Sequence, residues 1–347
     1  MNEKVLMKGN EAIAEAAIAA GCRHFFGYPI TPQTEVAAYM SKRMPKIGGV
    51  YLQAESEVAS INMVLGAGAA GVRVMTSTSS PGISLMAEGI SYLAGSDVPC
   101  LIVNVQRGGP GLGGIQPSQA DYFQATKSTA HGDFHILVFA PSTVQETVDM
   151  IATAFELGDK YRMPAMVLSD GMLGQMMEPV VLPEAREPDN DSKDWAVSGH
   201  KDKREHNVVN SLYINPQELE TLVKARFERY AEIKEKHQMA EEYLADDADI
   251  IIVAYGSSSR VSRSAIDAAR KQGIKVGMIR PITLWPFPEK VIEKHVGHAK
   301  AFLSVEMSMG QMVDDVKLVV NGRVPVEFYG RTGGMIPTPN EVLEQIV

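Results

Sequence analysis

The segment that decides the fold is Gly27-Tyr28-Pro29-Ile30-Thr31-Pro32, where a short apolar run ends in a proline-rich turn. Residues 23–27 before it have the pattern of a strand, and residues 33–43 after it have the pattern of a helix. The same order returns at Gln53-Ala54-Glu55-Ser56-Glu57, where a strand-like run gives way to a segment rich in Ala and Gly. Each segment therefore predicts a strand followed by a tight turn and a helix.

This alternation continues through the first half of the chain. The strands we expect are residues 23–27, 49–53, 72–76 and 99–105, and the helices are residues 11–20, 33–43, 57–70 and 83–94. Alternating strands and helices are typical of an α/β fold with a parallel sheet. Functional loops of such sheets lie at the carboxyl ends of the strands. The turns at residues 28–32, 77–82 and 107–114 should therefore lie along one edge of the sheet.

The pattern changes after residue 178. Residues 179–203 are polar and contain several prolines, which predicts a loop, and residues 216–244 read as a charged helix. A second α/β unit begins near Asp249. We therefore predict three parts: a first domain over residues 1–178, a loop and helical connector over 179–245, and a smaller domain over 246–347.

Composition excludes several classes of function. The net charge is -9 and no Lys/Arg-rich run is present, which argues against a nucleic-acid partner. Cys22 and Cys100 are the two cysteines and form no CxxC pair, so an iron–sulfur cluster or disulfide framework within this chain is not expected. No apolar run is long enough for a signal peptide or a membrane span. We expect a soluble, cytoplasmic protein.

Glu57 is the first candidate for chemistry. Ser56 is a suitable N-cap, which places Glu57 in the first helical turn. One interpretation is a carboxylate that merely interacts favourably with the helix dipole. The other is a buried carboxylate that hydrogen-bonds a ring nitrogen of a cofactor and takes part in acid/base chemistry. Glu55, two residues earlier, is the neighbouring candidate.

Thr31, Ser80 and Arg107 are the other candidates on the predicted edge. The Thr31 hydroxyl could bind a substrate carboxylate or carbonyl, or simply cap the next helix. Ser80 lies in a hydroxyl-rich helix start, which suits either an N-cap or a polar ligand group. Arg107 ends an apolar strand before a Gly-rich loop and could bind a carboxylate through two parallel hydrogen bonds. His131 is either a polar site residue or a loop histidine.

These motifs together resemble the alpha subunit of the 2-oxoacid:ferredoxin oxidoreductases. The resemblance extends over nearly the whole chain, and Ser80 departs from it, because the family more often has Gly there. The motifs that carry it are GYPITPQTE (27–35), QAESEVASINMVLGAGAAG (53–71), TSTSSPGISLMAEGISYLAG (76–95), QRGGPGLGGIQPSQAD (106–121), AYGSSS (254–259), RPITLWPFP (280–288), VEMSMGQM (305–312) and GRTGGMIPTPNEV (330–342).

The resemblance implies a pyrimidine-binding-type domain for thiamine diphosphate, followed by a transketolase C-terminal-like domain. It implies the reaction of a 2-oxoacid, CoA and oxidised ferredoxin to acyl-CoA, CO2 and reduced ferredoxin. Glu57 would activate the cofactor, and Thr31 and Arg107 would hold the substrate. The residues implied to contact the cofactor are Tyr28, Pro29, Ile30, Glu57 and Ser80.

The resemblance also implies partner subunits. The chain lacks the Gly-Asp-Gly and Asn-Asn pair that binds magnesium and diphosphate in thiamine enzymes. A beta subunit would carry Mg2+ and the diphosphate site, a delta subunit would hold [4Fe–4S] clusters, and a gamma subunit would complete the complex. The loop after Arg107 and the lack of a fused gamma-like domain favour the branched-chain (2-oxoisovalerate) type.

Several alternatives remain open at the level of sequence. A second basic residue, for which Lys127 is a candidate, would instead favour 2-oxoglutarate, and a pyruvate-specific member is also compatible with these motifs. A thiamine enzyme subunit without a redox step would have no cluster-bearing partner. A non-catalytic assembly subunit would remain active as a complex after Glu57→Gln.

Overall fold

The predicted parallel sheet forms the first part of the molecule. The computed structural model describes residues 4–188, 193–200 and 202–347, and seven strands make up this sheet in the order β12-β6-β7-β5-β4-β2-β3. Neighbouring strands are parallel except for the β12–β6 pair. The strands are β2 (His24–Gly27), β3 (Val50–Gln53), β4 (Val74–Thr78), β5 (Leu101–Gln106), β6 (Leu137–Phe139), β7 (Ala165–Asp170) and β12 (Thr283–Trp285).

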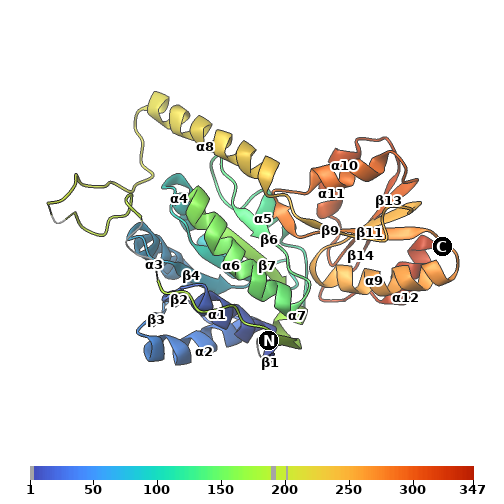
Figure 1. The fold of residues 1–347 in the computed structure, drawn as a ribbon, viewed down its shortest axis with the longest axis horizontal. Coiled ribbons are helices and arrows are strands. Elements are labelled where there is room, and N and C mark those ends of the chain that lie inside the picture. The colour runs from blue at the N-terminus through green and yellow to red at the C-terminus, as the bar shows by residue number, and fades with distance from the viewer. Residues whose placement is uncertain (1–3, 189–192, 201) are drawn as a thin grey trace.

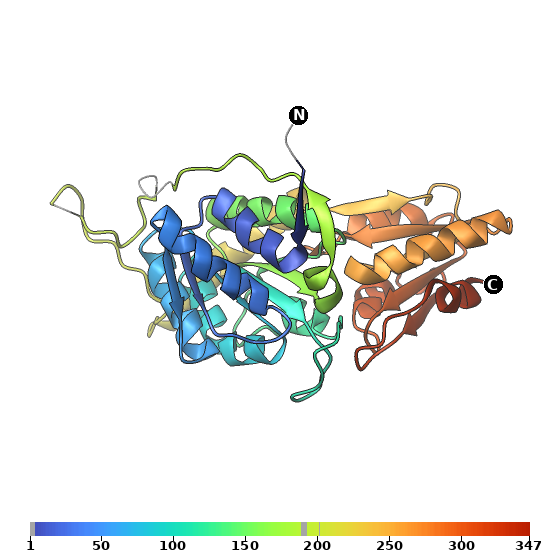
Figure 2. The ribbon, with the colours of Figure 1, turned by 90° about the horizontal axis from the view of Figure 1, so that it is seen from below.

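Helices cover both faces of the seven-stranded sheet (Figure 2). α1 packs on α2 and α6, and α3 packs on α4. Glycine allows the close approach of the last pair, because a Cβ at Gly89 of α4 would overlap the side chain of Ile61 in α3. The helices are α1 (Gly9–Ala19), α2 (Thr34–Arg43), the 3₁₀ turn η1 (Met44–Ile47), α3 (Glu57–Ala69), α4 (Pro81–Gly95), α5 (Tyr122–Thr126), α6 (Val144–Tyr161) and α7 (Gly171–Gln175).

A second, five-stranded sheet has the order β14-β13-β10-β11-β9. Its strands are parallel except for β9, which is antiparallel to β11. The strands are β9 (Ala240–Tyr243), β10 (Ile250–Val253), β11 (Val276–Pro281), β13 (Ala301–Glu306) and β14 (Val326–Gly330). The helices beside it are α9 (Gly256–Lys271), α10 (Glu289–Val296), α11 (Met312–Val320) and α12 (Pro339–Ile346). The α/β fold class predicted from the sequence is thus confirmed.

The segment between the two sheets differs from its predicted form at both ends. The predicted loop begins later, because β8 (Met177–Val180) pairs with β1 (Val5–Lys8). The predicted helix over residues 216–244 is shorter, since α8 (Pro216–Lys236) stops and β9 follows. Between β8 and α8 the described residues form neither helix nor strand. Arg186 and Val197 donate backbone hydrogen bonds to Ala19 and Ala69, whereas a later part of the stretch extends away from the body before α8 (Figure 1).

The two parts are joined by shared elements. β12 comes from the second part of the sequence but completes the first sheet, and one buried apolar cluster contains residues of both parts, such as Tyr122 and Tyr255. In the part of the chain that the structure describes, no helix is both long and apolar enough to cross a membrane.

The parallel strands also bring the predicted loops to one edge. β5, β4, β2 and β3 are consecutive neighbours, so the turns after Gly27, Gln53, Thr78 and Gln106 all leave the sheet on the same side. This edge positions the candidate site.

Candidate functional site

Glu57 is a buried carboxylate at the start of α3. Ser56 caps the helix by accepting a hydrogen bond from the Ala59 N–H (3.2 Å), as the sequence predicts. Glu57 is only 5% exposed, whereas Glu55 is exposed. Among the described residues, no hydrogen bond ends on the Glu57 carboxylate. Buried carboxylates usually have partners, so a partner from outside the chain is expected here.

The start of α4 lies against this carboxylate. A Cβ at Gly82 would overlap the Thr78 hydroxyl and would lie 2.9 Å from Oε1 of Glu57. The hydroxyls of Thr78 and Ser79 are buried and have no hydrogen-bond partner within the described chain. Buried polar groups without partners are rare in folded proteins. The Thr78 hydroxyl lies with Glu57 around the Cβ position of Gly82, so two polar groups without partners among the described residues lie close together, as expected of a ligand site.

The turn at residues 28–32 forms the next part of the edge. Tyr28, Pro29 and Thr31 are exposed and Ile30 is half-buried, so this turn remains accessible. Gln33, immediately after the turn, is fully buried. Its amide donates to the Tyr28 carbonyl (3.3 Å) and its Oε1 accepts from the Ser77 hydroxyl (2.6 Å). Gln33 therefore ties the turn to β4, a role that the sequence did not reveal.

Arg107 joins two loops of the edge. Its guanidinium donates to the backbone carbonyls of Thr31 (3.0 Å) and Leu112 (3.1 Å), and its buried Nε has no partner among the described residues. The terminal nitrogens thus already carry bonds to the protein, which the sequence could not predict. Arg107 is brought close to Thr31, as expected for two residues of one site, and its substrate role stays a prediction.

Ser80 occupies an unusual backbone conformation, with φ of 20° at the start of α4. Its N–H donates to Oδ1 of Asn104 (3.0 Å), and its hydroxyl donates to Oδ2 of Asp121 (2.6 Å) and accepts from the Arg107 N–H (3.0 Å). The Asn104 amide also donates to Asp121 (2.9 Å). Burial raises the pKa of Asp121, and these two hydrogen bonds offset part of the rise. The sequence analysis missed Asn104 and Asp121. Asn104 could have been noticed as a polar residue inside an apolar strand, and Asp121 as an acidic residue after the Gly-rich loop.

Two other candidates lie elsewhere. His131 is exposed and contacts Ser91 at the far end of α4. Lys127 forms an ion pair with Asp315 of α11 (2.5 Å) and so belongs to the seam with the second sheet. Neither joins Glu57.

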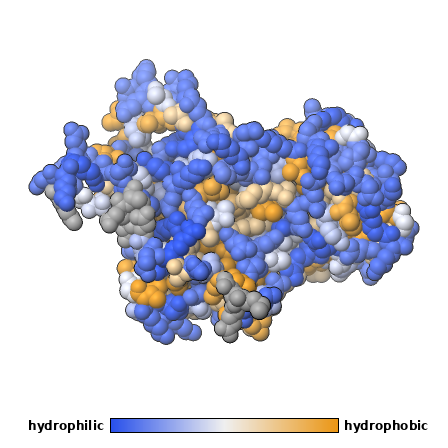
Figure 3. Space-filling view, viewed as in Figure 1, coloured by the Kyte–Doolittle hydropathy of each residue, from blue (hydrophilic) through white to orange (hydrophobic). Residues whose placement is uncertain are grey.

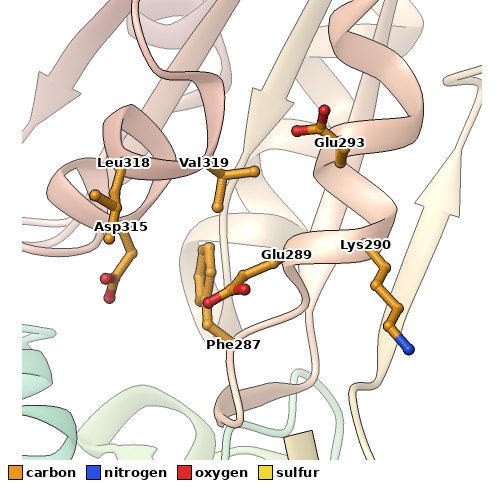
Figure 4. Close-up of a pocket in the computed structure, with 7 residues that line it drawn as sticks. All are labelled: Phe287, Glu289, Lys290, Glu293, Asp315, Leu318 and Val319. Carbon is orange, nitrogen blue, oxygen red and sulfur yellow. The ribbon is translucent and has the colours of Figure 1, made fainter. Parts of the chain in front are cut away.

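Hollows elsewhere on the surface do not coincide with this edge. A pocket of about 380 Å³ between α10 and α11 has the apolar residues Phe287, Leu318 and Val319 and the acidic residues Glu289 and Glu293 among its walls (Figure 4). One of its carboxylates already has a partner in the protein, because Glu293 forms an ion pair with Arg323. Its buried carboxylate, Asp315, is paired with Lys127, unlike Glu57.

One cluster has the residue types of a metal site. Glu242, Asp246 and His295 offer ligand atoms within 4.8 Å of one another. The ammonium of Lys294 already contacts Glu242 (2.8 Å) and Asp246 (3.4 Å), so a cation of the chain itself offsets part of the negative charge of this cluster.

Two family models match the chain. Residues 15–247 match the model described as pyruvate flavodoxin/ferredoxin oxidoreductase, thiamine diphosphate-binding. Residues 248–342 match the model of pyruvate:ferredoxin oxidoreductase core domain II. The boundary between the two models falls between β9 and β10.

Similar proteins agree with these matches. The chain is 49% identical to a ketoisovalerate oxidoreductase subunit VorB of Methanothermobacter thermautotrophicus, over 98% of this chain and 96% of the relative. It is 37% identical to a 2-oxoglutarate synthase subunit KorA of Methanothermobacter marburgensis, over 100% and 99%.

Solved structures show the same relationship. A 2-oxoglutarate:ferredoxin oxidoreductase from Magnetococcus marinus, solved with 2-oxoglutarate, coenzyme A and succinyl-CoA, matches with a TM-score of 0.85 and 28% identity, over 99% of this chain and 65% of that longer chain. A split-gene transketolase matches with a TM-score of 0.61 and 13% identity, over 98% and 97%, which supports the fold alone.

Proposed function

The chain belongs to the 2-oxoacid:ferredoxin oxidoreductase family, and from this premise we propose that it is the subunit that holds the pyrimidine end of thiamine diphosphate during oxidative decarboxylation of a branched-chain 2-oxoacid. The products would be the acyl-CoA, CO2 and reduced ferredoxin. The single observation that carries this proposal is Glu57, a buried carboxylate for which the described chain supplies no hydrogen bond.

The polar groups around Glu57 fit the ring edge of a heterocycle. Because Gly82 has no Cβ, the start of α4 packs directly against the Thr78 hydroxyl and Glu57, and that hydroxyl has no hydrogen-bond partner among the described residues. Glu57 would accept a hydrogen bond from a ring nitrogen and exchange a proton with it, which is general acid/base work. When bound, the cofactor supplies the electron sink that lets a 2-oxoacid lose CO2. We assign further cofactor contacts to the exposed backbone of residues 28–30 and to Ser80.

Thr31 and Arg107 would bind the substrate carboxylate. The Thr31 side chain is exposed beside the carbonyl to which Arg107 donates. Arg107 forms no ion pair with the described residues, and its buried Nε is free of hydrogen bonds within them. A guanidinium and a hydroxyl together can fix the orientation of a carboxylate by charge-assisted hydrogen bonds. The keto carbon would then be held at a set distance from the cofactor.

A partner subunit would complete this site. Three apolar side chains near Glu57 are exposed, namely Leu52 on β3, Val58 on α3 and Leu85 on α4, and apolar residues gather over the β3 end of the molecule in Figure 3. Exposed apolar patches of this kind mark interfaces. We assign Mg2+ and the diphosphate site to a beta subunit, and [4Fe–4S] clusters and contact with ferredoxin to further subunits of the gamma and delta type.

The acyl group is assigned from the loop after Arg107. Leu112 and Ile115 are the large side chains of this loop, are both exposed, and are both apolar. An apolar wall suits a branched aliphatic chain and gives no partner to the second carboxylate of 2-oxoglutarate. Lys127, which could have supplied one, is paired with Asp315. The relatives named ketoisovalerate oxidoreductase support the same choice.

The test is CoA-dependent viologen reduction by the purified native complex. We expect 2-oxoisovalerate to be the best substrate among 2-oxoisovalerate, 2-oxoglutarate, pyruvate and indolepyruvate. A preference for 2-oxoglutarate would overturn the branched-chain assignment alone. No reduction with any 2-oxoacid would overturn the proposed reaction.

A further inference from the structure

The segment between the Gly-rich loop and α5 connects the site to the second sheet. We call residues 118–121 the strap. They follow the loop that begins at Arg107, and nothing in the function proposed above requires them. Their hydrogen bonds nevertheless run in both directions, toward Ser80 on one side and toward the second part of the molecule on the other.

On the side of the second sheet, the strap is held by Gln119. The side-chain amide donates to the Tyr255 carbonyl (2.8 Å) and accepts from the Ser258 hydroxyl (2.5 Å) and the Met307 N–H (3.0 Å). The Gln119 N–H also donates to the Met307 carbonyl (2.8 Å), and the Tyr255 hydroxyl donates to the Gln119 carbonyl (3.2 Å). All four residues are buried. Gln119 is therefore fixed entirely by the second part of the chain.

On the side of the site, the strap ends in Asp121. One carboxylate oxygen accepts both from the Ser80 hydroxyl (2.6 Å) and from the Asn104 amide (2.9 Å), while Asn104 accepts from the Ser80 N–H (3.0 Å). The side chains of Asp121, Asn104 and Ser80, with the Ser80 backbone N–H, form a closed ring of hydrogen bonds. The Ser80 hydroxyl is thereby oriented to accept from the Arg107 N–H (3.0 Å).

The ring acts on both ends of the proposed site. Ser80 has a φ of 20°, a conformation that persists only when its surroundings hold it, and it opens the helix whose Gly82 lies against Glu57. The bond to the Arg107 N–H fixes the backbone from which the guanidinium reaches Thr31. Without Asp121, both the helix start and the arginine would be less well defined.

We propose that Asp121 is a positioning residue, and that through the strap the second domain holds Ser80 and Arg107 in the geometry that binds the 2-oxoacid. This inference rests on the proposed function, because it names the residues that set substrate affinity at the same site. It also gives the second domain a task in catalysis: its docking onto Gln119 determines how well the arginine is placed.

The second domain offers a matched pair of variants. Ser257 and Ser258 are adjacent buried serines in the first turn of α9, and each donates one hydrogen bond across the seam. Ser258 donates to Gln119 of the strap (2.5 Å), whereas Ser257 donates to Asp170 in front of α7 (2.6 Å). Both alanine variants remove one hydroxyl from the same helical turn, so a merely structural role predicts equal effects.

The experiment compares Asp121→Ala, Asp121→Asn, Ser258→Ala and Ser257→Ala in the complete complex. The readouts are kcat and KM for the 2-oxoacid and hydrogen–deuterium exchange of the segments around Ser80 and Arg107. For Asp121→Ala we expect KM to rise about tenfold, more than kcat falls, and exchange to become faster in both segments. Asp121→Asn should recover most of the loss, because one amide oxygen can accept both hydrogen bonds.

Ser258→Ala should raise KM and exchange in the same direction by a smaller factor, and Ser257→Ala should leave both within about twofold of wild type. Equal effects of the two serine variants would overturn the proposal. So would unchanged exchange at Arg107 in Asp121→Ala, or an Asn variant as impaired as the Ala variant. If none of the 2-oxoacids supported viologen reduction by the wild-type complex, the proposed function would fail. The hydrogen–deuterium exchange data would still show whether the strap holds the segments around Ser80 and Arg107.

Discussion

Two buried glutamates, one beside each sheet, differ in how the protein satisfies them. Glu57 opens α3 after β3, the edge strand of the first sheet, and Glu306 ends β13, which lies next to the edge strand of the second. Glu57 is 5% exposed and Glu306 is fully buried. Glu57 receives no hydrogen bond from the described residues, but Glu306 receives five, from the hydroxyls of Ser304 and Ser308 and the N–H groups of Gln311, Met312 and Val313, at 2.9–3.0 Å.

The difference separates a functional carboxylate from a structural one. Five donors satisfy Glu306 and hold the turn before α11, so its charge is stabilised within the fold. Glu57 is buried at a similar depth, and its burial costs stability unless a ligand provides the missing hydrogen bond. The first sheet therefore leaves its polar groups available at the edge, whereas the second sheet uses them internally.

The comparison is tested most strongly by Glu57→Gln. We expect viologen reduction to fall by a factor of about 10² to 10⁴, because the proton exchange with the cofactor is lost. The thermal midpoint of the complex should change little, since no protein hydrogen bond is broken. The matched control is Glu55→Gln, which alters an exposed carboxylate two residues away and should keep activity within about twofold. Activity retained in Glu57→Gln would remove the distinction between the two glutamates.

The second test is Glu306→Gln. An amide group can accept at one of its two ends only, so at least two of the five donors would face another donor. We expect the free energy of unfolding to fall by about 2–3 kcal/mol, seen as a lower thermal midpoint in calorimetry of the complex. Activity per assembled complex should be nearly unchanged below the new midpoint. A large loss of kcat in a normally stable variant would give Glu306 a catalytic role and contradict the comparison.

The third test, Gly82→Ala, changes the space around Glu57 rather than its charge. The added methyl would overlap the Thr78 hydroxyl and crowd Glu57, so α4 would have to shift. We expect destabilisation of about 1–3 kcal/mol and a weaker response of the thermal midpoint to added thiamine diphosphate. Gly66→Ala in α3 is the control, because no atom lies within 4 Å of its added methyl. Equal behaviour of the two variants would mean that cofactor binding does not depend on the close packing of α4 against Glu57.

The smallest effect is expected at His135, a half-buried base away from both glutamates. His135 stacks on Trp285 with ring centroids 4.7 Å apart, and burial lowers its pKa to about 4. The unfolded chain takes up this proton near pH 6.5 and the folded chain only near pH 4, so stability falls as the pH decreases between these values. His135→Gln should weaken that dependence of the thermal midpoint, and His131→Gln, at an exposed site, should not. An unchanged slope in His135→Gln would mean that His135 does not cause the loss of stability at low pH.

Much of the fold could be predicted because it depends on local pattern. The helix expected over residues 57–70 is found at Glu57–Ala69, and the strand expected over residues 23–27 is β2. The prediction for the connector was less accurate. Residues 240–243 continue a charged helical pattern in the sequence, but in the structure they form a strand that pairs with β11. That pairing depends on a strand more than 30 residues later, and no local periodicity reports it.

The sequence by itself determined the alternation of strands and helices, the capped start of α3 at Ser56 and the presence of hydroxyl, carboxylate and guanidinium groups in turns that share one edge. These follow from side-chain spacing and turn chemistry, which act over a few residues. Only the tertiary structure decided that Glu57 is buried without a partner among the described residues, that Arg107 binds the Thr31 carbonyl, and that Asp121 links Ser80 to the second domain through Gln119. Hydrogen bonds between residues distant in sequence form only after the sheets have packed, so their partners are set by the three-dimensional arrangement and not by the order of the chain.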